Sequence, residues 1–302
     1  MQIIRPSIYT SIDTVLDSTT VPETDFAAWA AGTSYTTGTK VIRTTTHRIY
    51  QNIQAGIDAG LPENTPSRWQ DIGPTNAYAM FDSISSTQTT ATDSFTVVLT
   101  PGTRVDSLAF INLKGLTLTV SATNNGAEEI YNQTFQLNQA GVTSWFAWFF
   151  EPFVQKRDVY ILDFPVTYAN PIITITLSTD SGLTVGMGRG LWGRKYDSGD
   201  IEFGATLSIK DYSAKTTDTN NNTYLTKKSN VKLLRFNSVL NQEDTNRIST
   251  TLRDLLSIPC VFIGYKGAGY EYLSAHGFYQ NFTITATNPV ENYVSLEIEE
   301  LT

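Results

Sequence analysis

Short runs of β-branched and aromatic residues, partly alternating with polar ones, occupy the middle of the chain. Turn-forming sequences such as Pro101-Gly102, Asn124-Asn125-Gly126 and Asp180-Ser181-Gly182 separate these runs. Short strands at this spacing, with no helical period among them, predict an antiparallel β-sandwich of the jelly-roll type over residues 76–195. The predicted strands are residues 95–99, 107–113, 116–120, 159–164 and 172–177.

The pattern changes after residue 196. Strand-like segments at 200–210 and 231–239 precede one segment in which apolar residues recur at helical spacing, from Asn241 to Pro259. An amphipathic helix must pack its apolar face on a sheet, and the neighbouring strands provide one. Residues 196–302 are therefore predicted to form an α+β domain with one clear helix, which makes the chain mainly β as a whole.

A polar segment, residues 215–230, lies between the first two of these strands. It is rich in Thr and Asn and offers no apolar anchor in Thr216–Thr223. We expect it to form the tip of a hairpin that is either mobile or ordered by a partner.

Glycine, threonine and aromatic residues mark a separate small unit at residues 23–75. This segment has no helical period, so we expect a compact β-module that displays aromatic rings, which suit the apolar faces of sugars. Residues 1–22 precede it as an extended arm. That arm is expected to pair either with a neighbouring subunit or with a later sheet of its own chain.

The spacing of aromatic residues and glycines in this unit resembles the chitin-binding-type carbohydrate modules of bacterial chitinases. In phage genomes such a module often continues into a segment like residues 69–82. The sandwich is similar to galactose-binding-like domains, and the layout of the last domain resembles C-terminal domains of phage tail-tip proteins that build part of a ring. The residues that carry the first resemblance are Trp29, Gly32, Thr33, Tyr35, Gly38, Val41, Tyr50, Pro62, Trp69 and Gly73.

The resemblance implies a set of sugar contacts in the module. The rings predicted to stack on sugar are those of Trp29, Tyr35, Tyr50 and Trp69, and the predicted partners for sugar hydroxyls are Asn52, Gln70 and Asp71. An alternative is that the four rings form the core of a small domain, because so small a unit needs some of its aromatic residues inside.

The most aromatic run of the chain lies at residues 145–153. Such a run either closes one end of the sandwich as core or anchors an interface, since aromatic residues dominate binding hot spots. The interface candidates are Trp145, Trp148, Phe149 and Phe153.

Composition excludes several functional classes. The chain has 302 residues and a net charge of −8, which argues against a nucleic-acid surface. One cysteine, Cys260, and two histidines leave no disulfide framework or metal-binding spacing, and no catalytic motif is present, so we expect neither an enzyme nor a cofactor. The glycine-rich segment 186–193 is followed by more strand, which favours close backbone packing over a nucleotide loop.

Together these features predict a structural component of a bacteriophage tail tip or baseplate. We expect a homo-oligomer that contacts other tail proteins and presents its module to a host-surface glycan. The chain shows no signal peptide or membrane-spanning run, so we expect synthesis in the host cytoplasm and a place in the virion. Two alternatives are an accessory protein or depolymerase component acting on extracellular polysaccharide, and a module that serves only as a docking platform for other tail proteins.

Overall fold

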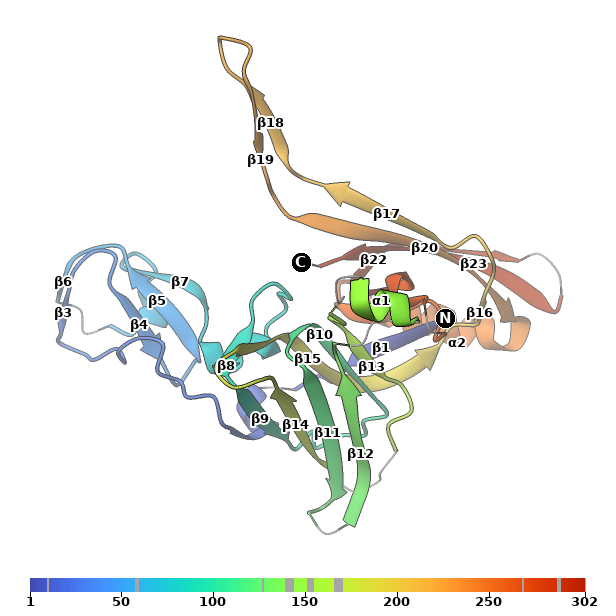
Figure 1. The fold of residues 1–302 in the computed structure, drawn as a ribbon, viewed down its shortest axis with the longest axis horizontal. Helices are drawn as coiled ribbons and strands as arrows, with labels where there is room; N and C mark the ends of the chain where they lie inside the picture. The colour runs from blue at the N-terminus through green and yellow to red at the C-terminus, as the bar shows by residue number, and fades with distance from the viewer. Residues whose placement is uncertain are drawn as a thin grey trace.

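The computed structural model describes residues 1–9, 11–57, 60–126, 128–138, 144–150, 155–165, 171–267, 269–286 and 289–301. The fold is mainly β, with antiparallel sheets, as the alternating pattern predicts. In Figure 1 a small module lies to one side of a central β-structure, and a long hairpin rises away from it.

The β-sandwich packs a five-stranded sheet against one half of a much larger sheet. Side chains alternate along its strands, so that in β14 Ile173, Ile175 and Leu177 are buried while Thr174 and Thr176 lie on the outer face. The five strands, in spatial order, are β12 (Glu128–Gln136), β11 (Thr117–Asn124), β14 (Pro171–Ser178), β9 (Ser94–Leu99) and β2 (Leu16–Thr19). The facing half of the larger sheet consists of β13 (Val159–Ile161), β10 (Ser107–Lys114), β15 (Thr184–Asp197) and β8 (Thr89–Thr92).

The larger sheet continues without a break into the C-terminal part of the chain. The inner strand β1 (Gln2–Pro6) makes the connection, because it pairs with β15 on one side and with β21 on the other. The remaining strands are β21 (Cys260–Ile263), β22 (Ser274–Ala286), β23 (Glu291–Glu300), β20 (Asn230–Asn241), β16 (Asp200–Ile201) and β17 (Thr206–Asp211). The start of the chain therefore joins its own later sheet, and the predicted boundary at residues 195–196 falls inside β15.

Close backbone contacts explain two of the glycines of β15. A side chain at Gly193 would collide with the carbonyl of Arg5 on β1, and one at Gly188 would collide with the carbonyl of Ser85. The prediction of close backbone packing in this segment is confirmed.

The predicted helix is present as α2 (Gln242–Asp254). It begins directly after Asn241 and buries Ile248 and Leu252 against the sheet. The hydroxyl of Tyr279 on β22 donates a hydrogen bond of 2.5 Å to the carbonyl of Leu252, which fixes the end of the helix to the sheet.

The polar segment between β17 and β20 forms a hairpin, as predicted. Beyond the β17 pairing, β18 (Ala214–Thr217) pairs with β19 (Thr223–Thr226), and the carboxylate of Asp218 accepts hydrogen bonds from the N–H groups of Asn220 and Asn222 in the turn. Residues 206–230 project from the central structure (Figure 1). From here on, 'the arm' means residues 206–230 and not the N-terminal segment 1–22.

The module contains two small sheets. One sheet has β4 (Lys40–Arg43), β5 (Arg48–Asn52) and β7 (Trp69–Pro74), and the other has β3 (Ser34–Tyr35) and β6 (Gly56–Ile57). The short helices of the chain are η1 (Ile12–Thr14), η2 (Pro62–Asn64), η3 (Asn76–Phe81), α1 (Trp145–Phe150) and η4 (Glu271–Leu273). None of the helices in the described ranges combines the length and apolar character that a membrane crossing requires.

Candidate functional site

Three of the four predicted sugar-stacking rings form the core of the module. Tyr35, Tyr50 and Trp69 are buried together with Val41, and the Tyr35 ring meets the Trp69 ring edge-on at 5.1 Å. With an exposed fraction of 2%, Trp69 presents no open ring face. For these three residues the sugar-stacking prediction is wrong, and the alternative of an aromatic core is right. The two small sheets have few other large apolar side chains to bury.

Asn52 is also buried, so its predicted contact with sugar hydroxyls does not fit its position. Its backbone holds the module together: the N–H donates to the carbonyl of Thr39, and its carbonyl accepts from the N–H of Gly38. The side-chain amide has no hydrogen-bond partner within the described part of the chain.

Gln70 and Asp71 are exposed at the module surface, whereas Trp29 is partly buried against the module core. The guanidinium of Arg43 lies over the Trp29 ring at 5.2 Å and forms two hydrogen bonds of 3.0 and 3.2 Å with the carboxylate of Glu63. Asp71 is paired with Arg48 at 2.9 Å, and Gln70 is exposed. Burial pushes the pKa of Glu63 up, but the hydrogen bond and charge of Arg43 outweigh this effect, so that pKa lies below its ordinary value.

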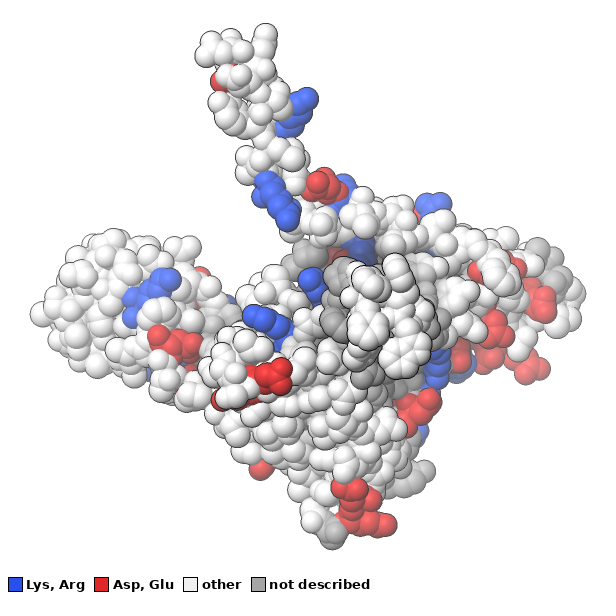
Figure 2. All heavy atoms as spheres, viewed as in Figure 1, with Lys and Arg blue, Asp and Glu red and all other residues white. Residues whose placement is uncertain are grey.

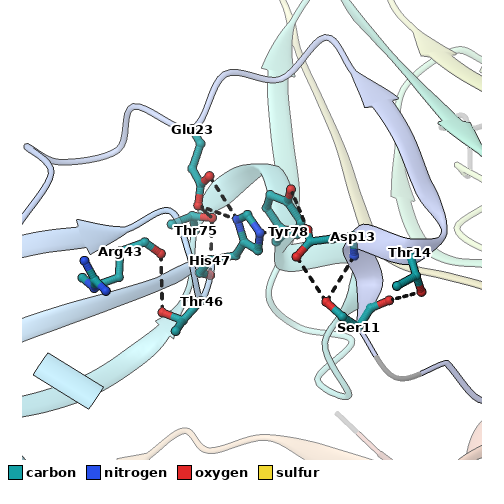
Figure 3. Close-up of polar contacts among 9 residues, drawn as sticks. All are labelled: Ser11, Asp13, Thr14, Glu23, Arg43, Thr46, His47, Thr75 and Tyr78. Carbon is teal, nitrogen blue, oxygen red and sulfur yellow. Dashed lines mark hydrogen bonds and ion pairs between the residues drawn. The ribbon is translucent and has the colours of Figure 1, made fainter. Parts of the chain in front are cut away.

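A polar cluster centred on His47 joins the module to the rest of the chain (Figure 3). The ring nitrogen Nδ1 lies 3.1 Å from both carboxylate oxygens of Glu23, and Nε2 lies 2.9 Å from Oδ1 of Asp13. The ring stacks on Tyr78 with a centroid separation of 3.6 Å, and the hydroxyl of Thr75 donates to Glu23 at 2.8 Å. We name these five residues the His47 cluster.

The geometry of the His47 cluster suits a structural tie better than catalysis. The two carboxylates lie at opposite nitrogens of the ring, and both nitrogens donate only when the imidazole is protonated. No serine or threonine hydroxyl bonds to this ring among the described residues, and no group of side chains in that part of the chain has the arrangement of a metal site. Burial, followed by the charges of Asp13 and Glu23, raises the pKa of Tyr78 to about 12, so Tyr78 stays protonated near neutrality.

The aromatic run is exposed in α1. The exposed fraction is 80% for Trp145, 69% for Phe149 and 47% for Trp148, and the rings of Trp145 and Phe149 stack on each other. Closure of the sandwich by these residues does not fit their exposure. Phe153 lies outside the described residues, and the interface prediction for the others stays a prediction.

The arm carries exposed apolar side chains that were not among the predicted site residues. Ile209, Tyr224 and Leu225 are exposed, the last by 74%. Tyr224 and Leu225 lie inside a segment that is otherwise polar, and that interruption was the available signal in the sequence.

No protein-family model matches the sequence, and no curated protein is significantly similar to it. The chitin-binding and tail-protein resemblances therefore depend only on the residues of this chain that carry them.

Proposed function

We propose that this chain is a structural subunit of a bacteriophage tail tip or baseplate, which assembles into a symmetric homo-oligomer and presents its module to a host-surface glycan. The observation that carries the assembly part is the arm. The arm is a hairpin whose apolar side chains are exposed to solvent. Because its own chain does not cover them, we infer that a second chain does.

The arm has few contacts with its own chain. Beyond the pairing of β17 with β20, the hydroxyl of Tyr212 donates to Glu299 at 3.3 Å near its base, and the outer part is exposed on every side. Burying an exposed leucine or isoleucine on a partner contributes about 1.5 to 3 kcal/mol. Free backbone groups along its edges add the capacity to pair with another strand.

Charge favours a second copy of this chain as the partner. The arm holds four Lys and two Asp, a net charge of +2, and subtracting this from the total of −8 leaves −10 for the rest of the chain. Figure 2 shows basic side chains along the arm. Because the arm points away from its own central structure (Figure 1), contact between arm and body joins different copies. Such a head-to-tail contact closes into a ring when the rotation between copies allows it.

The glycan part of the proposal depends on the position and remaining surface of the module. The module lies clear of the central structure (Figure 1), Gln70 and Asp71 are exposed on it, and Trp29 is only partly buried. Single shallow sugar sites are weak, and repetition around a ring raises the overall affinity. The burial of the other three rings favours a second candidate function, in which the module is only a docking platform for other tail proteins.

The assembly part is tested by removing the arm. Asp211 and Asn230 are paired residues, so replacing residues 212–229 by Asn-Gly closes the hairpin with a two-residue turn and leaves β17 and β20 intact. We expect the wild type to form a ring of defined mass in native mass spectrometry and the shortened variant to be a folded monomer. The matched control is the double variant Thr217→Ser and Thr223→Ser, which keeps the arm and its apolar side chains and should still assemble.

A monomeric wild type at micromolar concentration, or a shortened variant that still assembles, would contradict the assembly role of the arm.

The glycan part is tested by binding to bacterial surface polysaccharide and to chitin oligomers. Trp29→Ala is expected to lose binding while the protein stays folded, because Trp29 is the one predicted stacking ring that is not fully buried. Phe203→Ala, at an exposed aromatic residue outside both the module and the arm, serves as the control and should bind like the wild type. If the folded oligomeric wild type binds no glycan, the docking-platform function replaces the glycan part.

A further inference from the structure

Three arginines line a hollow beside β1 of the large sheet. The hollow has a volume of about 240 Å³ and lies between β1, the end of β15 and the loop that precedes β10. Its lining residues are Arg5, Pro6, Ser7, Ile8, Thr103, Arg104, Arg194 and Tyr196.

None of these three arginines forms an ion pair within the described part of the chain. No lining residue of the hollow is acidic, whereas Arg43, Arg48, Arg235 and Arg247 are each paired with a carboxylate. The chain has 29 acidic and 21 basic residues, so a shortage of carboxylates does not explain three unpaired guanidinium groups.

The arrangement has a cost for the free protein. Arg5 and Arg194 are direct partners in the antiparallel pairing of β1 with β15. Like charges at directly opposite positions of an antiparallel pair destabilise it. Arg5 is also half-buried, where solvent screens its charge less than at an exposed position. An anion bound between these side chains would turn this repulsion into attraction.

We propose that this hollow binds a phosphate group, supplied either as free phosphate or by a phosphate ester. Arginine matches phosphate oxygens with two parallel N–H donors, and three guanidinium groups from three segments can surround a tetrahedral, doubly charged group. Thr103 and Tyr196 add hydroxyl donors at the wall. The site is separate from the arm and the module, so it does not depend on the proposed assembly or on glycan binding by Trp29.

The proposal predicts two opposite effects of one substitution. Arg194→Gln removes a like-charge contact, so the melting temperature of the protein without phosphate should rise or stay constant. The same substitution removes a phosphate contact, so phosphate binding should weaken by about tenfold or more. If Arg194 had only a structural role, the substitution would not weaken phosphate binding while leaving the melting temperature unchanged or higher.

The experiment is isothermal titration calorimetry in a phosphate-free buffer at low ionic strength, with melting curves in parallel. Inorganic phosphate, glycerol 3-phosphate and glucuronate are titrated into the wild type, Arg104→Gln, Arg194→Gln and the control Arg247→Gln. Arg247 is paired with Asp244 on α2, so its substitution changes the net charge equally without touching the hollow. The arm-shortened monomer is included and should bind like the wild type.

Saturable phosphate binding that weakens in the two hollow variants but not in Arg247→Gln supports the proposal. Tighter binding of glycerol 3-phosphate than of inorganic phosphate would identify a phosphate ester as the source, and the reverse would identify free phosphate. The proposal is overturned if phosphate does not bind saturably, if Arg247→Gln weakens it equally, or if glucuronate binds more tightly than both phosphates.

Discussion

His276 is a histidine buried without a polar partner. Its exposed fraction is 2%, and neither ring nitrogen has a hydrogen-bond partner in the described part of the chain. Burial, with a smaller effect of the positive charge of Arg189, lowers the pKa of His276 to about 3. The ring is therefore neutral in the folded protein over most of the accessible pH range.

This histidine should make the folded state sensitive to acid. An unfolded histidine takes up a proton below about pH 6.5, whereas folded His276 takes one up only near pH 3, so stability falls as the pH drops through this window. In His276→Gln the slope of unfolding free energy against pH should be smaller between pH 6 and pH 4, by at most about 1.4 kcal/mol per pH unit. Urea denaturation of both proteins at several pH values measures this difference.

Because the carboxylates titrate alike in both proteins, comparing the two slopes isolates His276. Equal slopes would show that folded His276 is protonated near its ordinary pKa.

At single positions, the sequence shows which residue types are unusual, but it does not show whether a residue has a structural role or a binding role. Tyr35, Tyr50 and Trp69 are predicted from the sequence to stack on sugar, and this is wrong because they are buried in the module core. Aromatic rings serve cores and sugar sites alike, so the residue type alone does not decide between the two. In strands of two to six residues, apolar and polar positions alternate too few times to show which face of the strand is buried. The His47 cluster joins residues from separate segments, and no local spacing marks such a meeting.

At the scale of elements, prediction succeeded where one local period dominates. The helix at 242–254 follows from apolar spacing, and strands such as β14 follow from strict alternation. The arm was expected as a hairpin tip, and the structure extends it into the ladder of β18 with β19 because Thr, Tyr and Leu there tolerate extended backbone. The sequence did not predict which strands become neighbours. The pairing of β1 with β15 and β21 joins segments that are far apart in the sequence, and no local pattern marks such a pair.

At the scale of the molecule, the His47 cluster determines how the module is held. Asp13 and Glu23 come from the segment leading into the module, whereas Thr75 and Tyr78 come from the segment leaving it. A contact between the two connections restricts how the module turns relative to the body (Figure 3).

Removing this tie should free the module without unfolding the body. In His47→Asn the imidazole contacts are lost, while asparagine tolerates the left-handed backbone at this position, where φ is 54°. Small-angle X-ray scattering should show a larger radius of gyration, and proteases should cleave residues 19–26 faster. The control Thr46→Ala loses only one weak hydrogen bond, to the carbonyl of Arg43, and should scatter like the wild type. Identical scattering of all three proteins would show that other contacts hold the module.

The inner position of β1 affects how the protein is made. Gln2 pairs with both Asp197 and Ile263, so β1 finds its second neighbouring strand only after the long segment between β1 and β21 has been synthesised. Until then one edge of β1 or β15 is open, and open edges pair readily with strands of other chains. Nascent chains on neighbouring ribosomes therefore meet with exposed edges, and slower translation lengthens the interval in which they can aggregate.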